Sequence, residues 1–135
     1  MHSLRQRINT RDESGFTLIE LLVVLIIIGI LLAIAVPSYL GFRDKAQKTA
    51  AASDVREAIP SAEAFYSDNN TYTGLSVAAL KGYDSGLSSA IGTAKPENAG
   101  ANYCIEATVG THKAVVNGPG GTVLMDSDAG FADCA

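Results

Sequence analysis

Residues 15–36 read GFTLIELLVVLIIIGILLAIAV, and this stretch decides the fold and the setting of the chain. The run of about 21 residues from Phe16 to Val36 contains one charged side chain, Glu20. As a helix rising about 1.5 Å per residue, the run is long enough to cross the ~30 Å hydrocarbon core of a bilayer. A carboxylate at mid-membrane costs on the order of 2.5–3.5 kcal/mol on insertion scales. The sequence therefore predicts a membrane helix whose single acid requires a partner.

Residues 1–15 form a polar leader that contains three arginines. A secretory signal peptide has its apolar core before the cleavage site, but here the apolar run follows Gly15. Cleavage between Gly15 and Phe16 would therefore remove only the leader and leave the membrane segment at the new N-terminus. Short basic flanks orient a first helix with the basic side in the cytoplasm. On composition alone, an uncleaved single-pass anchor with a short cytoplasmic tail is the simpler hypothesis.

Residues 15–24 and the aliphatic run after them resemble the class III signal of type IV prepilins and pseudopilins. Gly29 within the run, Pro37 at its end and two cysteines near the C-terminus also match that pattern. The N-terminal motif is very specific and covers roughly the first 40 residues, whereas the remainder fits in layout only. The resemblance implies that an inner-membrane prepilin peptidase cuts after Gly15 and N-methylates Phe16.

The resemblance also implies that mature chains polymerise into helical filaments with their N-terminal helices in the centre. Glu20 is then implied to pair with the terminal amine of a neighbouring subunit. The physics supports this role, because cleavage creates a cation on Phe16 in a water-poor setting, where an unpaired charge is costly. Pairing within one chain would also satisfy Glu20. Pairing between chains would in addition set the axial register, which is the best-attested use of a buried polar group.

Gly29 and Pro37 bracket a weak stretch of helix. Pro37 has no N–H to donate to the carbonyl of Ala33, and a glycine costs a helix close to 1 kcal/mol relative to alanine. A plain kink is one interpretation, because such residues are tolerated in membrane helices. The resemblance implies the other, in which this segment loses helicity when the subunit moves from membrane to filament.

Residues 38–135 are long enough for one extracytoplasmic head with a modest core. Without the leader, the chain has seven Lys and Arg against 12 Asp and Glu, a net charge of −5. A chain with this net negative charge lacks the excess of basic side chains that binds nucleic acid, so no nucleic-acid partner is predicted.

The helix is predicted to continue from Ser38 to about Tyr66. Asp44 and Lys48 have the spacing of an i,i+4 ion pair, and Pro60 predicts a bend or a locally open turn. Apolar residues at helical period predict the face that packs on the head. These residues are Val55, Ile59, Ala62 and Tyr66, with Phe65 beside them.

Residues 67–70 end this helix with turn chemistry. The segment from Tyr72 to about Asn102 is predicted as a variable loop with a short helix at Ser76–Leu80. Alternation and β-propensity predict three strands, at Tyr103–Val109, His112–Asn117 and Thr122–Asp126. The predicted fold class is α+β: a long N-terminal helix, half in the membrane and half amphipathic, packed on a small antiparallel sheet of three to four strands.

Cys104 and Cys134 are the only cysteines. Both follow the membrane segment on the translocated side, where disulfides persist. A bridge would close a loop of about 31 residues and contribute roughly 3–4 kcal/mol in the chain-entropy model. The resemblance implies such a bridge, because in pilins a cysteine pair at this position encloses the exposed D-region. Two free thiols or a metal pair are the alternatives, although no further ligands cluster nearby.

No catalytic constellation stands out, so the chain is not predicted to be an enzyme or to hold a cofactor. His2 falls in the leader, and His112 stands alone as an ordinary surface residue. Gly118–Gly121 lacks the strand–loop–helix context of a phosphate-binding loop. The resemblance raises a calcium site, because major pseudopilins bind calcium near the C-terminus. The aspartates there lack EF-hand spacing and are predicted as solvated turn residues: Asp126, Asp128 and Asp133.

Three functional hypotheses remain. The first is a structural subunit of a type IV pilus fibre, single-pass in the inner membrane with its head outside, and extracellular after assembly. The second is a pseudopilin of a type II secretion or DNA-uptake apparatus. Both imply, as partners, further copies of the chain, prepilin peptidase, an assembly platform, minor pilins and membrane lipid. The third is a membrane-anchored binding domain that never polymerises.

Overall fold

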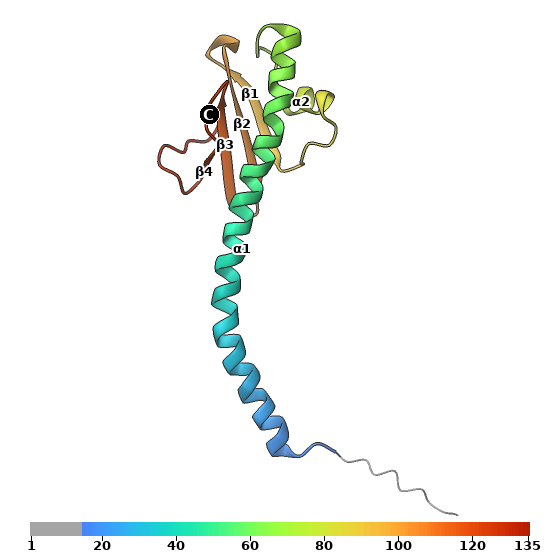
Figure 1. The fold of residues 1–135 in the computed structure, drawn as a ribbon, viewed down its shortest axis with the longest axis vertical. Coiled ribbons are helices and arrows are strands. Elements are labelled where there is room, and N and C mark those ends of the chain that lie inside the picture. Colours follow the sequence, from blue (N-terminus) through green and yellow to red (C-terminus); the bar gives the residue numbers. More distant parts are fainter. Residues whose placement is uncertain (1–14) are drawn as a thin grey trace, which may run out of the picture. The chain divides into compact units, whose positions relative to one another are not determined.

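The computed structural model describes residues 15–135, so the predictions for leader residues 1–14 lie outside the described residues. The chain divides into two compact units between Ser38 and Tyr39. The first unit contains the N-terminal part of helix α1 (Leu18–Asn69). The second unit, Tyr39–Ala135, is called the head below and contains the rest of α1 and every other helix and strand of the described chain (Figure 1).

Helix α1 is 52 residues long and remains helical across Pro37 and Pro60. The continuation of the helix beyond the apolar run is therefore confirmed, and a bend at Pro60 stays a prediction. The helix ends where Asn69 Nδ2 donates to the carbonyl oxygen of Phe65 at 2.9 Å. Asn70 follows with a φ of 54°, the left-handed conformation that commonly terminates helices.

The buried face of α1 includes three residues of the predicted stripe, Val55, Ala62 and Phe65, and Ile59 packs against the core although it is only half-buried. Tyr66 is 41% exposed, so the prediction is wrong at that residue. Alanines at helical spacing dominate the buried face, because small side chains let the sheet approach the helix closely. Tyr66 instead stacks at the edge of the head on Tyr72, with ring centroids 4.8 Å apart. The buried residues of α1 are Ala51, Ala52, Val55, Ala58, Ser61, Ala62 and Phe65.

The sheet has four antiparallel strands in chain order: β1 (Ile91–Glu97), β2 (Asn102–Val109), β3 (His112–Gly118) and β4 (Leu124–Met125). The α+β prediction is confirmed. Strands β2, β3 and β4 overlap the three strands predicted from the sequence.

Strand β1 lies in the segment predicted as a variable loop, and this part of the prediction is wrong. Gly92 and Pro96 are poor strand formers. Pro96 is nevertheless tolerated, because β1 is an edge strand and pairs only with β2. The strand register shifts around Gly92. Before β1, helix α2 (Val77–Tyr83) begins after Ser76, whose Oγ accepts a hydrogen bond from the Ala79 N–H, and it overlaps the predicted short helix.

Strand β2 is buried on both faces. Ile105 and Ala107 belong to the apolar cluster that includes the buried face of α1. Successive side chains of a strand point to opposite faces. Cys104 is therefore buried on the other face, where it is bonded to Cys134.

Glu63 of α1 holds two buried tyrosines. Its Oε2 accepts a hydrogen bond from the Tyr72 hydroxyl at 3.1 Å, and its Oε1 accepts one from the Tyr103 hydroxyl at 3.2 Å. Burial, together with the Glu63 carboxylate, raises the pKa of Tyr72 to about 12. The same causes raise the pKa of Tyr103. Both phenols therefore stay protonated and tie α1 to the loop before α2 and to β2.

Candidate functional site

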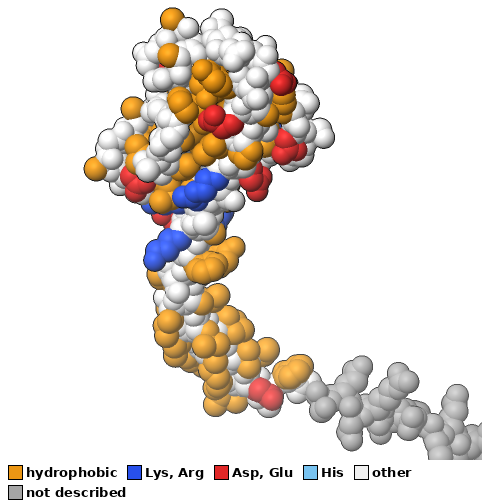
Figure 2. Space-filling view, turned by 45° about the horizontal axis from the view of Figure 1, so that its top comes forward, with side chains coloured by type: hydrophobic (Ala, Val, Ile, Leu, Met, Phe, Trp, Pro, Cys, Tyr) orange, Lys and Arg blue, Asp and Glu red, His pale blue; other side chains and the backbone are white. Residues whose placement is uncertain are grey.

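The N-terminal part of α1 leaves its apolar side chains without partners in the described chain. Every residue from Gly15 to Ala46 is exposed. Among residues 15–135, α1 is the one helix long and apolar enough to cross a membrane, with a mean hydropathy of 3.2 over its best 18-residue window. Figure 2 shows a nearly continuous surface of hydrophobic side chains along this segment. Soluble monomers rarely expose such a patch, so we expect lipid or other protein surfaces to cover it.

Glu20 also has a local role that the sequence analysis missed. Thr17 caps the start of α1: its Oγ1 accepts a hydrogen bond from the Glu20 N–H at 3.2 Å, and its carbonyl oxygen accepts one from the Leu21 N–H at 3.2 Å. The signal was present as the Thr-x-x-Glu spacing of a capping box. The carboxylate of Glu20 in the first turn also interacts favourably with the positive end of the helix macrodipole. Any assembly role of Glu20 is therefore additional to its role in starting the helix.

The other predicted N-terminal site residues lie along the same segment. Gly15 and Phe16 precede α1, and Phe16 is 78% exposed. The Phe16 amine arises only on cleavage, so its pairing with Glu20 stays a prediction. Gly29 and Pro37 lie inside α1, and the loss of helicity there on assembly also stays a prediction.

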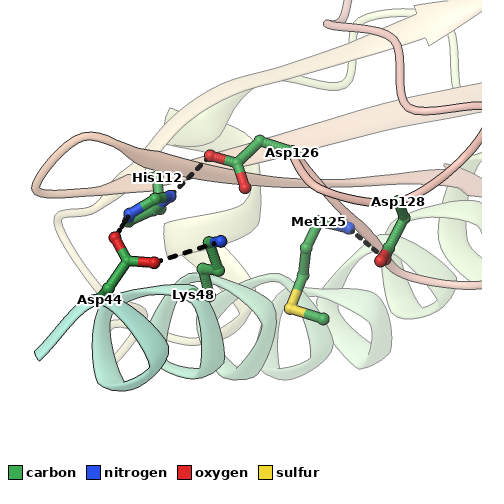
Figure 3. A network of polar contacts seen from close by, with 6 residues as sticks. All are labelled: Asp44, Lys48, His112, Met125, Asp126 and Asp128. Carbon is green, nitrogen blue, oxygen red and sulfur yellow. Dashed lines mark hydrogen bonds and ion pairs between the residues drawn. The ribbon is translucent and has the colours of Figure 1, made fainter. Parts of the chain in front are cut away.

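In the head, His112 joins α1 to the start of strand β3 in a network of charged side chains (Figure 3). Its Nε2 lies 2.6 Å from Oδ1 of Asp44 on α1, and its Nδ1 lies 2.8 Å from Oδ2 of Asp126. The other Asp44 oxygen pairs with Lys48 Nζ at 3.3 Å, which confirms the i,i+4 prediction. The prediction that His112 stands alone is wrong. Strand β3 brings it between two carboxylates that lie 68 and 14 residues away in sequence.

Both ring nitrogens of His112 carry protons in this arrangement, since an unprotonated nitrogen would place two acceptors against each other. The hydrogen bonds to Asp126 and Asp44 raise the pKa of His112 above its ordinary value of 6.5. The hydrogen bonds from His112 and Lys48 lower the pKa of Asp44 below 3.8, and the hydrogen bond from His112 lowers the pKa of Asp126. The network is thus fully charged in mildly acidic solution.

We expect the contribution of this network to the stability of the head to be largest in mildly acidic solution. The raised pKa of His112 gives a contribution that is complete below pH 6.5 and is lost as the pH rises through the raised value. The lowered pKa values of Asp44 and Asp126 give a contribution that is present above pH 3.8 and is lost as the pH falls through them. Urea midpoints from about pH 3 to about pH 9 measure both limbs.

The loss of stability at rising pH should be much smaller in a His112→Asn variant. Lys48→Gln is the matched control, because it removes a neighbouring cation of Asp44 and leaves the His112 contacts in place. This control should keep the alkaline decline. A decline of equal size in His112→Asn and wild type would show that His112 does not carry it.

The C-terminal segment after β4 is tied back to the sheet. Cys134 forms the predicted disulfide with Cys104 of β2, with the two Cα atoms 5.7 Å apart. The Cys134 N–H also donates to Oε2 of Glu106 at 3.2 Å. Lys113 Nζ lies 3.2 Å from Oε1 of Glu106 and 3.0 Å from Oδ1 of Asp133. Glu106 is buried, and these partners compensate the charge that burial would otherwise leave unpaired.

The three C-terminal aspartates diverge to separate partners. Asp126 contacts His112, Asp133 contacts Lys113, and Oδ2 of Asp128 accepts a hydrogen bond from the Met125 N–H at 2.8 Å (Figure 3). No group of three potential metal ligands occurs within the described range 15–135. Each of these carboxylates thus makes a structural contact within the head.

Comparisons with known proteins bear on the N-terminal segment. Residues 10–36 match the family described as "Prokaryotic N-terminal methylation motif". The chain is 43% identical over 63 residues to the type IV wide pilus major component PilA4 of Thermus thermophilus, covering 47% of this chain and 48% of that protein. It is 40% identical over 62 residues to the type II secretion system core protein G of Aeromonas hydrophila, covering 46% and 43%.

A third relative is the type IV major pilin protein PilA of Myxococcus xanthus, 37% identical over 67 residues, which cover 50% of this chain and 30% of that protein. In all three cases the match spans less than half of the relative's length. The matched motif and the two kinds of relative confirm the resemblance drawn from residues 15–24.

Proposed function

We propose that this chain, which carries the N-terminal methylation motif and is similar to type IV pilins and pseudopilins, is a structural subunit of a type IV pilus fibre. In this proposal a prepilin peptidase cleaves the chain after Gly15 and methylates Phe16. Helix α1 holds the subunit in the inner membrane, and an assembly platform with minor pilins then adds it to an extracellular filament of identical chains. The exposed apolar part of α1 is the observation that carries the proposal.

Glu20 supplies the specificity of assembly in this proposal. Cleavage places a cation on Phe16, four residues before the carboxylate of each chain. In the apolar centre of a filament, a charge left without its partner costs about 3–5 kcal/mol. Pairing between the amine of one copy and Glu20 of the next therefore favours one axial register over others. Gly29 and Pro37 would let the helix adjust locally as the subunit leaves the membrane, since both weaken helical hydrogen bonding or packing.

A Glu20→Gln variant tests the proposal. Glutamine removes the charge but is accepted at this position of a capping box, so α1 should still begin at the same place. Loss of about 3 kcal/mol or more should lower filament yield by more than about 100-fold. The measurement is filament mass in the sheared surface fraction relative to subunit in the membrane fraction.

The matched control is Thr17→Ala, which removes the cap but keeps the carboxylate. Its cost is about 1 kcal/mol to the helix start, and filaments should still form. Mass analysis should find methylated Phe16 at the N-terminus of both variants, which separates an assembly defect from a processing defect. Equal filament yield in Glu20→Gln and wild type would contradict the role of Glu20 in assembly, and absence of filaments from the wild type itself would favour a membrane-anchored domain that does not polymerise.

A pseudopilin of a type II secretion apparatus is the second candidate, favoured by the similarity to protein G of Aeromonas hydrophila. The cysteine pair favours the pilus, because the resemblance implies that major pseudopilins usually lack one. Electron microscopy of sheared surface material distinguishes the two machines. Long extracellular fibres support the pilus. Their absence in a strain whose type II secretion requires this chain supports the pseudopilus.

A further inference from the structure

We propose that four exposed residues at the start of the head bind the headgroups of anionic phospholipids and so fix the depth of the subunit in the membrane. These residues, called the collar below, are Tyr39, Phe42, Arg43 and Lys45. The proposal rests on the membrane-anchoring part of the proposed function and does not depend on polymerisation.

The collar surrounds α1 just before the buried face of the helix begins at Ala51. Successive residues of an α-helix are about 100° apart. The buried face of α1 runs through Ala51 and Val55, which places Phe42 nearly opposite to it and the other collar residues on its two sides. Tyr39 is 66% exposed and Phe42 is 75% exposed. Arg43 lies on the flank nearest the sheet, beside Gly110 and Thr111, and is still exposed. Two aromatic rings and two long basic side chains thus surround this turn of α1.

The charge of the collar is not neutralised within the head. Asp44 lies between Arg43 and Lys45 in sequence, but its carboxylate contacts His112 of β3 and Lys48 of α1. Among residues 15–135, neither Arg43 nor Lys45 forms a salt bridge. The collar therefore presents two cations, while the nearest acid in sequence, the half-exposed Asp44, is already paired with His112 and Lys48.

The position of the collar matches the edge of a bilayer. Tyr39 follows Phe16 by about 23 residues, and a membrane helix needs about 20 apolar residues to cross the hydrocarbon core. Arg43 and Lys45 follow Val36, the last residue of the apolar run, by seven and nine residues. Aromatic side chains with a polar tip settle at the headgroup level, and lysine and arginine reach outward from it. A phosphate-bearing anionic headgroup, such as that of phosphatidylglycerol, is the partner that complements both features.

A single tryptophan makes the collar observable. The sequence contains no tryptophan, so Phe42→Trp gives one fluorophore at an exposed site. The full chain is placed in phosphatidylcholine vesicles that contain phosphatidylglycerol, with brominated acyl chains on one lipid or the other. Quenching then reports which lipid lies beside the collar. We expect phosphatidylglycerol to be favoured by about fivefold for each cation, and the preference to weaken with added salt.

The test variant adds Arg43→Gln and Lys45→Gln to Phe42→Trp, and its lipid preference should fall to near one. The matched control instead adds Lys81→Gln and Lys95→Gln, which remove the same charge elsewhere in the head and should leave the preference intact. An undiminished preference in the test variant overturns the proposal. So does absence of quenching by either lipid, the result expected if a second copy of the chain covers the collar.

Failure of the proposed function gives a different pattern. A Glu20→Gln chain that no longer assembles should still show the phosphatidylglycerol preference at position 42. A chain that does not float with vesicles at all would overturn both the proposed membrane anchoring by α1 and the proposed lipid binding by the collar. The lipid preference and the filament yield are therefore separate readouts.

Discussion

Replacing Cys104 and Cys134 together with serine should lower the free energy of unfolding of the head by roughly 3–4 kcal/mol. The disulfide joins residues 30 positions apart, and most of its effect is to restrict the unfolded chain. The C-terminal segment that it ties back to β2, residues 119–134, has little regular structure beyond the two residues of β4. Few backbone hydrogen bonds therefore replace the covalent link when it is lost.

Urea unfolding of the full chain in detergent, followed by circular dichroism, measures this effect. Reduction of the wild-type protein should move its midpoint to that of the double serine variant. Asp133→Asn is the matched control, because it breaks only an exposed ion pair of Lys113 and should change stability by less than about 1 kcal/mol. A midpoint that is the same with and without the disulfide would contradict the prediction.

Replacing Gly118 with alanine should destabilise the head by about 2–4 kcal/mol. A Cβ atom at position 118 would overlap the ring of Tyr103, which pairs with it across β2 and β3 and is only 1% exposed. The ring has no free space to enter, and any shift would disturb its hydrogen bond to Glu63. Overpacking of this kind costs about 1–3 kcal/mol, and loss of the hydrogen bond adds about 1 kcal/mol.

Gly92 provides the matched control, because a Cβ atom there would meet no neighbour and the residue also lies in a strand. Gly92→Ala should leave the free energy of unfolding within about 0.5 kcal/mol of wild type or raise it slightly. A double-mutant cycle with Tyr103→Ala isolates the clash. Gly118→Ala should cost much less in that background, and an equal cost in both backgrounds would place the strain elsewhere.

Local patterns predicted most of the fold. The strands β2 and β3 follow from alternation and β-branched residues, and the helix beyond the membrane follows from its period. Strand β1 does not follow from local patterns, because Gly92 and Pro96 lower its β-propensity and only pairing with β2 makes it a strand. The buried face of α1 was predicted correctly at Val55, Ala62 and Phe65 but not at Tyr66. The buried Ala51, Ala52 and Ala58 were missed, because alanines carry little hydrophobic signal although they allow the closest packing.

The candidate site divides in the same way. A helix start with a capping spacing, an apolar run and one acid are properties of neighbouring residues, so the sequence by itself determined the N-terminal segment and its relation to pilins and pseudopilins. The contacts of His112 with Asp44 and Asp126, and the contact of Glu106 with Cys134, join residues 14 to 68 positions apart. Only the tertiary structure decided these, because charge partners at that separation depend on strand register and helix placement, which no local pattern encodes.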